Sequence, residues 1–334
     1  MKRLPSQSGI ALLLVLWVLA ILTVLVLSFS FLARTETNAT ISFKTGIEKR
    51  YLAEAGLERG IMEVFYRLVN NNPSVIPEEG HEVWKVNGKT YTDTTGDGSY
   101  KVRVTDDSGK VDINALTDVN SGILRNLLKN AVGVQDEDTV NTIVDSILDW
   151  KDSSAKGLGA HRLNGAGDDY YKSLPNPYEA KHANFDTLEE LVLVKGVTPE
   201  ILFGDREKKG LIEFLAIKPN SRPGVLLINV NSAPEEVLEA IPGMTPELAA
   251  AILALRETKE IMSLGEIPAL MQQPQMVSLY LNQNPGNGSN IFTIETLGYI
   301  DDENSGHTIK ATIFLEGPSK FHYLFYKSPA KLLQ

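Results

Sequence analysis

The chain lacks cysteine entirely: none occurs among its 334 residues. It can therefore form no disulfide and no thiolate zinc site, and it has no cysteine nucleophile. Basic side chains are also few, since 32 Lys and Arg stand against 42 Asp and Glu and give a formal net charge of −10. Proteins that bind nucleic acid without regard to sequence need a basic surface to neutralise phosphates, so the charge balance argues against that class.

Sequence motifs of the common enzyme classes are missing too. The five histidines are scattered and show no metalloprotease pairing: His81, His161, His182, His307 and His322. Gly88-Lys89-Thr90 ends like a phosphate-binding loop, but Val83 stands where such a loop begins with Gly. No Gly-x-Ser-x-Gly nucleophile motif occurs. We expect a protein that is not an enzyme.

What the chain does have is one long apolar run near its start, from Ile10 to Ala33, with Lys2 and Arg3 ahead of it. As a helix rising about 1.5 Å per residue it would span about 36 Å, which exceeds the roughly 30 Å of a bilayer core. No second run of spanning length occurs. Because the positive charges precede the run, we expect a single membrane span with a cytoplasmic N-terminus.

The run starts directly after Gly9, which ends a short basic leader. This arrangement resembles the leader of type IV pilins and of the pseudopilins of type II secretion. The resemblance implies that a prepilin peptidase cuts between Gly9 and Ile10, and that the new Ile10 amine is methylated. An uncleaved signal anchor with a chance glycine is the alternative.

The fifth residue after the expected cut is Leu14. Most pilins carry a Glu there, and in the family picture that carboxylate neutralises the N-terminal ammonium of a neighbouring subunit in the fibre. A buried charge without a partner is costly. A subunit without this Glu therefore fits the tip, where no earlier subunit presents an ammonium. The resemblance implies the same, because the K-type minor pseudopilin characteristically lacks the Glu.

Helical character continues beyond the apolar run. No Pro interrupts residues 35–68, and Asn70-Asn71-Asn72-Pro73 ends the pattern. We predict one helix over Ile10–Val69, whose second half packs an apolar stripe on a soluble domain. The stripe is made of two sets with spacings of three to four residues: Ile47, Tyr51 and Ala55, then Leu57, Ile61, Phe65 and Leu68.

Strands are predicted on both sides of a long helical stretch, with turns at Gly88 and Gly96-Asp97-Gly98. The five predicted strands are His81–Val86, Tyr100–Val104, Phe292–Ile300, His307–Leu315 and Phe321–Tyr326. They would form one antiparallel sheet on the long helix. The predicted class is therefore α+β, a pilin-like helix packed on an antiparallel sheet, with a large all-α domain of helix-hairpin or SAM-like repeats inserted between strands.

The inserted stretch carries a weak repeat of an apolar–Gly–apolar turn between two short helices, at Gly133, Gly196 and Gly243. In the last copy Ser232 and Glu235 fit a capping box, and Thr245 with Pro246 fits the start of the next helix. Helix-hairpin turns also contact DNA backbones, but Pro246 lacks an amide hydrogen and glutamates surround this turn. A packing or interaction module is the preferred interpretation.

The order of elements is similar to that of K-type pseudopilins over nearly the whole chain, including Tyr51–Glu58 after the anchor. The resemblance implies successive parts: a leader (1–9), a transmembrane and pilus-core helix (10–33), a pilin-like body (34–114 and 285–334), and an inserted helical domain (115–284, in subdomains of about 115–215 and 228–284). Implied partners are the I- and J-type minor pseudopilins, other pseudopilus subunits and the inner-membrane assembly platform. The implied place is the bacterial inner membrane with the body in the periplasm. The implied role is priming of the pseudopilus tip for export of folded proteins across the outer membrane.

Four carboxylates flank a glycine-rich loop, residues 156–167: Asp149, Asp152, Asp168 and Asp169. Oxygen ligands without cysteine suit a hard cation such as Ca²⁺, although the spacing is not that of an EF-hand. The K-type family is associated with calcium in its helical domain, and this segment is similar to that region. We therefore predict a structural calcium site with these four ligands, with a solvated acidic loop as the alternative.

Two other functions fit the same sequence. The first is a minor pilin of a surface type IV pilus. Neighbouring genes for secretion or for pilus assembly would distinguish it from a pseudopilin of type II secretion. The second is a membrane-anchored helix-hairpin-helix DNA-binding protein, indicated by Ile228–Glu257. A gel shift that weakens as salt rises would favour it.

Overall fold

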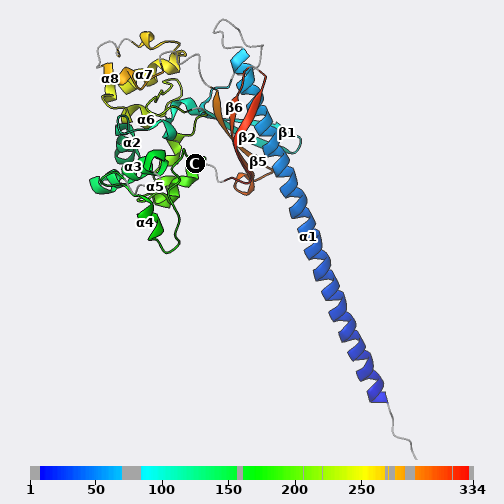
Figure 1. Ribbon diagram of the computed structural model, residues 1–334. Helices are drawn as coiled ribbons and strands as arrows, with labels where there is room; N and C mark the ends of the chain where they lie inside the picture. The colour runs from blue at the N-terminus through cyan, green and yellow to red at the C-terminus, as the bar shows by residue number, and fades with distance from the viewer. Residues whose placement is uncertain are drawn as a thin grey trace, which may run out of the picture.

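The computed structural model describes residues 8–69, 84–155, 161–205, 207–219, 221–267, 270, 275–282, 290–317 and 319–330. Its longest element is helix α1 (Ser8–Val69), which confirms the single long helix predicted over Ile10–Val69. The first part of α1 projects alone, and its last part lies across a sheet (Figure 1). Every side chain from Ile10 to Lys44 is exposed, so this projecting part is bare on all sides.

The sheet has five antiparallel strands in the order β1-β2-β5-β6-β7. The strands are β1 (Asn87–Thr95), β2 (Gly98–Asp106), β5 (Ile291–Tyr299), β6 (His307–Leu315) and β7 (Phe321–Lys327). Strand β2 pairs directly with β5, although more than half of the chain lies between them. The predicted α+β class is confirmed, with the two early and three late strands in one sheet.

The first strand lies further along the chain than predicted. Residues 81–83 are outside the described residues, and 84–86 are not in a strand. Gly88 lies inside β1 at an irregularity in its pairing with β2, not at a turn. Trp84 instead stacks on Tyr91, with ring centroids 4.5 Å apart. The alternation that predicted a strand therefore reflects side-chain packing against the sheet, and the threonine-rich residues that follow form the strand.

The face that α1 buries against the sheet is built on Ala53, Leu57, Ile61 and Val64. The predicted stripe is only partly right, because Tyr51 is 65% exposed. Between these apolar side chains, Gly56 and Gly60 lie directly against side chains of β2 and β5, which lets the helix approach the sheet closely. The apolar side chains left outside make up an uncovered surface on α1.

The chain between β2 and β5 forms the helical domain, which stands out to one side of the sheet (Figure 1). Its α-helices are α2 (Gly122–Asn126), α3 (Glu137–Lys151), α4 (Asp168–Lys172), α5 (Pro199–Phe203), α6 (Glu235–Ala240), α7 (Pro246–Thr258) and α8 (Gln275–Ser278). Strands β3 (Val111–Asp112) and β4 (Leu215–Ala216) form a small parallel pair. A π-helix, η3 (Leu127–Val132), continues α2. Short 3₁₀ helices connect these elements and the sheet strands: η1 (Asp107–Gly109), η2 (Ile113–Ala115), η4 (Ser153–Ala155), η5 (Leu188–Leu193), η6 (Leu211–Glu213), η7 (Leu264–Glu266) and η10 (Glu303–Ser305).

Buried side chains from the whole helical domain form one continuous apolar core. It includes Leu124 and Ile147 from the first half and Val237 and Ile252 from the second. The two predicted subdomains therefore share a core, and burial of these side chains is the main stabilising contribution to the domain.

A buried polar joint ties the helical domain to the sheet. We use this name for Asp106, Asp107, Asp112, Lys218 and Asn229, and the side chain of Lys218 lies at its centre. Its Nζ donates hydrogen bonds to the carbonyls of Ser108 (3.1 Å) and Leu227 (3.2 Å). Burial lowers the pKa of Lys218, while the carboxylates of the joint oppose that shift.

The glycine turns of the repeat lie between helices, and all three have positive φ: 83° at Gly133, 86° at Gly196 and 87° at Gly243. Glycine adopts this left-handed backbone without the steric cost that a side chain brings. After Gly243, Thr245 Oγ1 accepts a hydrogen bond from the Leu248 amide, which confirms the predicted cap of α7.

The capping box predicted at Ser232 and Glu235 is wrong. Helix α6 begins after Pro234, which makes no side-chain cap. Ser232 is buried, and its hydroxyl lies 3.5 Å from that of Ser108 beside the polar joint. Ser232 therefore contacts Ser108 between the two domains, and it does not cap α6 as the local sequence pattern predicts.

Candidate functional site

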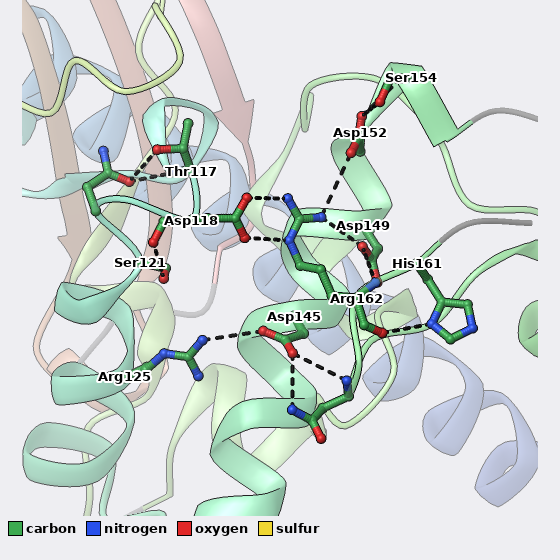
Figure 2. A network of polar contacts seen from close by, with 12 residues as sticks. Thr117, Asp118, Ser121, Arg125, Asp145, Asp149, Asp152, Ser154, His161 and Arg162 are labelled. Atoms are coloured by element: carbon green, nitrogen blue, oxygen red, sulfur yellow. Dashed lines mark hydrogen bonds and ion pairs between the residues drawn. The ribbon is translucent and has the colours of Figure 1, made fainter. Parts of the chain in front are cut away.

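Helix α3 carries the acidic side chains of the candidate site. Asp136 caps its N-terminus by accepting a hydrogen bond from the Thr139 amide, and six apolar side chains face the core: Val140, Ile143, Val144, Ile147, Leu148 and Trp150. Asp145 and Asp149 are four residues apart and therefore lie on one face of the helix. That face points to the loop of residues 161–167 (Figure 2).

The guanidinium of Arg162 lies between three carboxylates (Figure 2). Its Nε and Nη2 donate to the two oxygens of Asp118, at 2.7 and 2.8 Å, and its Nη1 donates to Asp149 Oδ1 at 2.7 Å. Nη1 is also 3.9 Å from Asp152 Oδ2. Paired bonds of this kind, made by a planar fork to a carboxylate, are among the strongest polar contacts in proteins.

The backbone of the loop reinforces the contact with α3. The Arg162 amide donates to both oxygens of Asp149, each at 3.1 Å. A Cβ on Gly165 would lie 1.8 Å from Asp149 Oδ2, so the close approach of the loop requires glycine here. The Asn164 amide and side chain donate to Asp145.

The charges in this network shift the pKa values of their neighbours. The hydrogen bond from Arg162 lowers the pKa of Asp118, and the carboxylates raise the pKa of Arg162. Burial raises the pKa of Asp149, which is 3% exposed, although Arg162 opposes the shift. Asp149 is thus a buried charge whose ionised form depends on its partner.

The other two predicted ligands lie in the first turn of α4. Asp168 Oδ1 accepts from the Ala180 amide and lies 3.0 Å from His182 Nε2. Burial raises the pKa of Asp168, but the bonds from His182 and Ala180 outweigh it and lower the pKa overall. Asp169 is exposed.

These residues do not fit a calcium site as they are arranged. Within the described part of the chain, no group of three or more His, Asp or Glu side chains is placed to hold a metal ion. Ca²⁺ takes six to eight oxygen ligands as a rule. Here Asp149 and Asp152 face a guanidinium, and Asp168 pairs with His182.

The sequence patterns did not point to Arg162 or to three of the residues around it: Asp118, Asp145 and His182. They lie 44, 17 and 20 positions away from Arg162 in sequence, where no local pattern connects them. Arg162 itself offered a signal, since it stands in the middle of the acidic, glycine-rich stretch.

The second predicted feature, the processing junction, lies at the start of the projecting helix. Residues 1–7 of the leader are outside the described residues, while Gly9 and Ile10 belong to the first turn of α1. Ile10 and Leu14 are 68% and 62% exposed. Among the described helices, α1 alone is long and apolar enough to cross a membrane.

The helix-hairpin surface does not resemble a phosphate-binding site. Glu235, Glu239 and Glu247 are exposed around the α6–α7 turn. Their charge would repel a nucleic-acid backbone.

Comparison with known proteins agrees with the architecture. Residues 108–203 and 228–286 each match a family model described as type II secretion system (T2SS), protein K. No curated protein matches the chain. The fold is similar to that of a chain in the crystal structure of the GspK-GspI-GspJ complex from the type 2 secretion system of enterotoxigenic Escherichia coli. That likeness has a TM-score of 0.64 and 16% identity, over 89% of this chain and 100% of that chain.

Both family models fall within the helical domain, and the fold likeness extends over the long helix and the sheet as well. The chain therefore belongs to the protein K family of the type II secretion system, the K-type minor pseudopilins.

Proposed function

We propose that this chain sits at the tip of the type II secretion pseudopilus, where it primes assembly for the export of folded proteins. The observation that supports a tip position is the helical domain, which stands out to the side of the pilin-like body (Figure 1). Subunits stacked on all sides in a fibre would clash with it. Leu14 agrees, because it offers no carboxylate to a preceding subunit.

The proposed partners are the I- and J-type minor pseudopilins. The similar chain comes from a structure titled as the complex of GspK with GspI and GspJ. On this chain the uncovered side of α1 offers Tyr51 and Met62, 65% and 63% exposed, beside Tyr323 and Tyr326 of the edge strand β7. Phe65 of α1 and Phe321 of β7 have ring centroids 5.9 Å apart, so α1 lies next to this edge strand. Aromatic side chains are enriched in protein interfaces.

The projecting part of α1 is proposed to hold the precursor in the inner membrane, with the N-terminus in the cytoplasm and the body in the periplasm. Its apolar side chains are exposed all round, which requires lipid or other helices as cover. Cleavage after Gly9 and methylation of Ile10 belong to the same proposal. The protein acts by assembly and not by catalysis.

Intact mass of the membrane-extracted protein, with and without the prepilin peptidase, tests the processing. We expect a mass that starts at Ile10 and carries one methyl group only when the peptidase is present. An uncut N-terminus in both samples would contradict the pseudopilin maturation.

The absence of native cysteine makes cross-linking a clean test of the partners. Tyr51→Cys and Tyr326→Cys should each form cross-links with cysteines on the I- or J-type subunit. Val119→Cys, a more accessible position on the helical domain at 91% exposure, is the control. Cross-linking that is as strong from Val119→Cys as from the other two would show that the proposed surface is not specific.

A further inference from the structure

The carboxylates predicted to bind calcium already surround a positive charge that belongs to the chain. We propose that Arg162 is a built-in cation: its guanidinium takes the place of a metal ion between α3 and the 161–167 loop, so the helical domain of this protein holds its fold without calcium. This inference goes beyond the proposed tip function and does not rest on it.

The contacts of Arg162 satisfy the carboxylates that a cation would have to neutralise. Asp118 receives two hydrogen bonds from the guanidinium, at 2.7 and 2.8 Å. Asp149 is 3% exposed and receives one from the guanidinium at 2.7 Å and two from the Arg162 amide at 3.1 Å. A buried carboxylate needs such partners, because without them its charge carries a large desolvation cost.

A metal ion could reach these oxygens only by displacing the guanidinium. Two positive charges a few ångströms apart repel strongly where water is partly excluded. The guanidinium of Arg162 is fixed at both ends of its fork, by the exposed Asp118 on one side and the buried Asp149 on the other (Figure 2). The fixed fork also explains why the loop approaches α3 closely enough to require Gly165.

The remaining predicted ligands do not restore a site elsewhere in the described residues. Asp168 is engaged by His182 and by the Ala180 amide. Asp152 accepts from the Ser154 amide and hydroxyl, at 2.9 and 2.6 Å. A hard cation would find no set of free carboxylates among the groups placed here.

The first experiment compares the full chain in non-ionic detergent with EGTA and with about 1 mM Ca²⁺, a concentration that loads weak extracellular calcium sites. We expect the same melting temperature in both and no binding heat by calorimetry. A melting temperature several degrees higher in Ca²⁺, with a saturable binding isotherm, would overturn the proposal.

The second experiment is done in EGTA and removes the positive charge of Arg162 by substitution. Arg162→Gln should lower the melting temperature by several degrees and should speed amide hydrogen exchange of residues 161–167 about tenfold or more. Arg162→Lys keeps the charge without the fork and should recover part of both. Lys129→Gln is the matched control, since it removes an exposed ion pair with Glu137 from the same domain.

A readout of charge separates this role from simple packing. In Arg162→Gln the buried Asp149 carboxylate loses its cation, so stability should fall as the pH rises from about 4 to 7, which the control should not show. Should Arg162→Gln not fold, Asp118→Asn breaks the paired contact at an exposed residue and should still speed exchange of the loop. Unchanged exchange and melting in both variants would overturn the proposal.

Discussion

Gly298 marks the closest approach between α1 and the sheet. A Cβ at this position would lie 2.3 Å from the Ala53 nitrogen and 2.3 Å from the Lys49 carbonyl oxygen. Both are backbone atoms, which cannot move aside as a flexible side chain can. A single missing side chain therefore sets how near the helix lies to β5.

Gly298→Val should lower the free energy of unfolding by about 3 kcal/mol, because the added atoms force α1 and β5 apart. Thermal unfolding of the full chain in detergent measures the change. The matched control is Gly46→Ala on the exposed part of α1, where a Cβ meets nothing within 4 Å. It should raise helix stability by about 0.5–1 kcal/mol. A neutral Gly298→Val would mean that the helix and sheet are not in close contact here.

Lys151, at the end of α3, makes a pH-dependent contribution. Its Nζ donates to the carbonyls of Ile113 and Asn114, at 3.2 and 2.8 Å. Burial lowers its pKa from 10.5 to about 8, although the charge of Asp112 opposes the shift. Because the unfolded chain then holds the proton more tightly than the folded one, this residue makes the protein more stable as the pH rises through that interval.

The prediction is measured against Lys151→Met. Between about pH 8 and 10 the wild type should gain stability relative to this variant, as followed by denaturant unfolding. Lys129→Met, at an exposed pair, should keep a constant difference from wild type over the same range. A difference that stays constant for Lys151→Met as well would show that its pKa is not lowered.

At the scale of the helix, short elements of the helical domain depend on their caps. Thr198 and Thr245 stand at the starts of α5 and α7, each followed by Pro, and each accepts a hydrogen bond from an amide three residues on. The two helices therefore begin with the same Thr-Pro N-cap. Ser232 has the right chemistry for a cap but contacts the polar joint instead.

Thr245→Ala and Thr198→Ala should each cost about 1 kcal/mol of unfolding free energy, the usual contribution of an N-cap. Ser232→Ala tests the correction at α6, because it should leave the hydrogen exchange of Glu235–Ala240 unchanged. Faster exchange of that helix in Ser232→Ala would show that Ser232 does cap α6. If the threonine variants were as stable as the wild type, the two threonines would not stabilise their helices as N-caps.

At the scale of the whole molecule, the two domains meet through the polar joint and through surface ion pairs. Thr293 of β5 donates to Asp107 Oδ2 at 2.6 Å, which links the sheet to the first residues of the helical domain. Arg67 of α1 also pairs with Glu260 at 3.0 Å, but both side chains are partly exposed. Exposed pairs contribute little, so the buried contacts should hold the domains together.

Lys218→Met should therefore destabilise the joint by about 1–3 kcal/mol, because the carbonyls of Ser108 and Leu227 lose their donor and the buried carboxylates lose a nearby cation. Hydrogen exchange of residues 106–112 and 226–230 reports on this loss. Arg67→Gln is the control and should cost less than about 1 kcal/mol. A larger loss of stability in Arg67→Gln than in Lys218→Met would show that the surface ion pair contributes more to the interdomain contact than the buried joint does.

The sequence by itself determined the features that depend on local pattern. The long helix, the three late strands and the turn at Thr245-Pro246 are where their periodicity and caps predict them. The insertion also follows from sequence order, since strand patterns stand on both sides of a helical stretch. Each of these conclusions needs only neighbours within a few residues along the chain.

Only the tertiary structure decided which groups meet across the chain. Glycines such as Gly60 and Gly298 lie where α1 meets the sheet, because backbones approach most closely where side chains are absent. Asp118 reaches Arg162 from 44 residues away, and this contact replaces the open carboxylate set that spacing alone predicts. The partner of a buried charge is set by three-dimensional proximity and desolvation, and neither is written in local sequence.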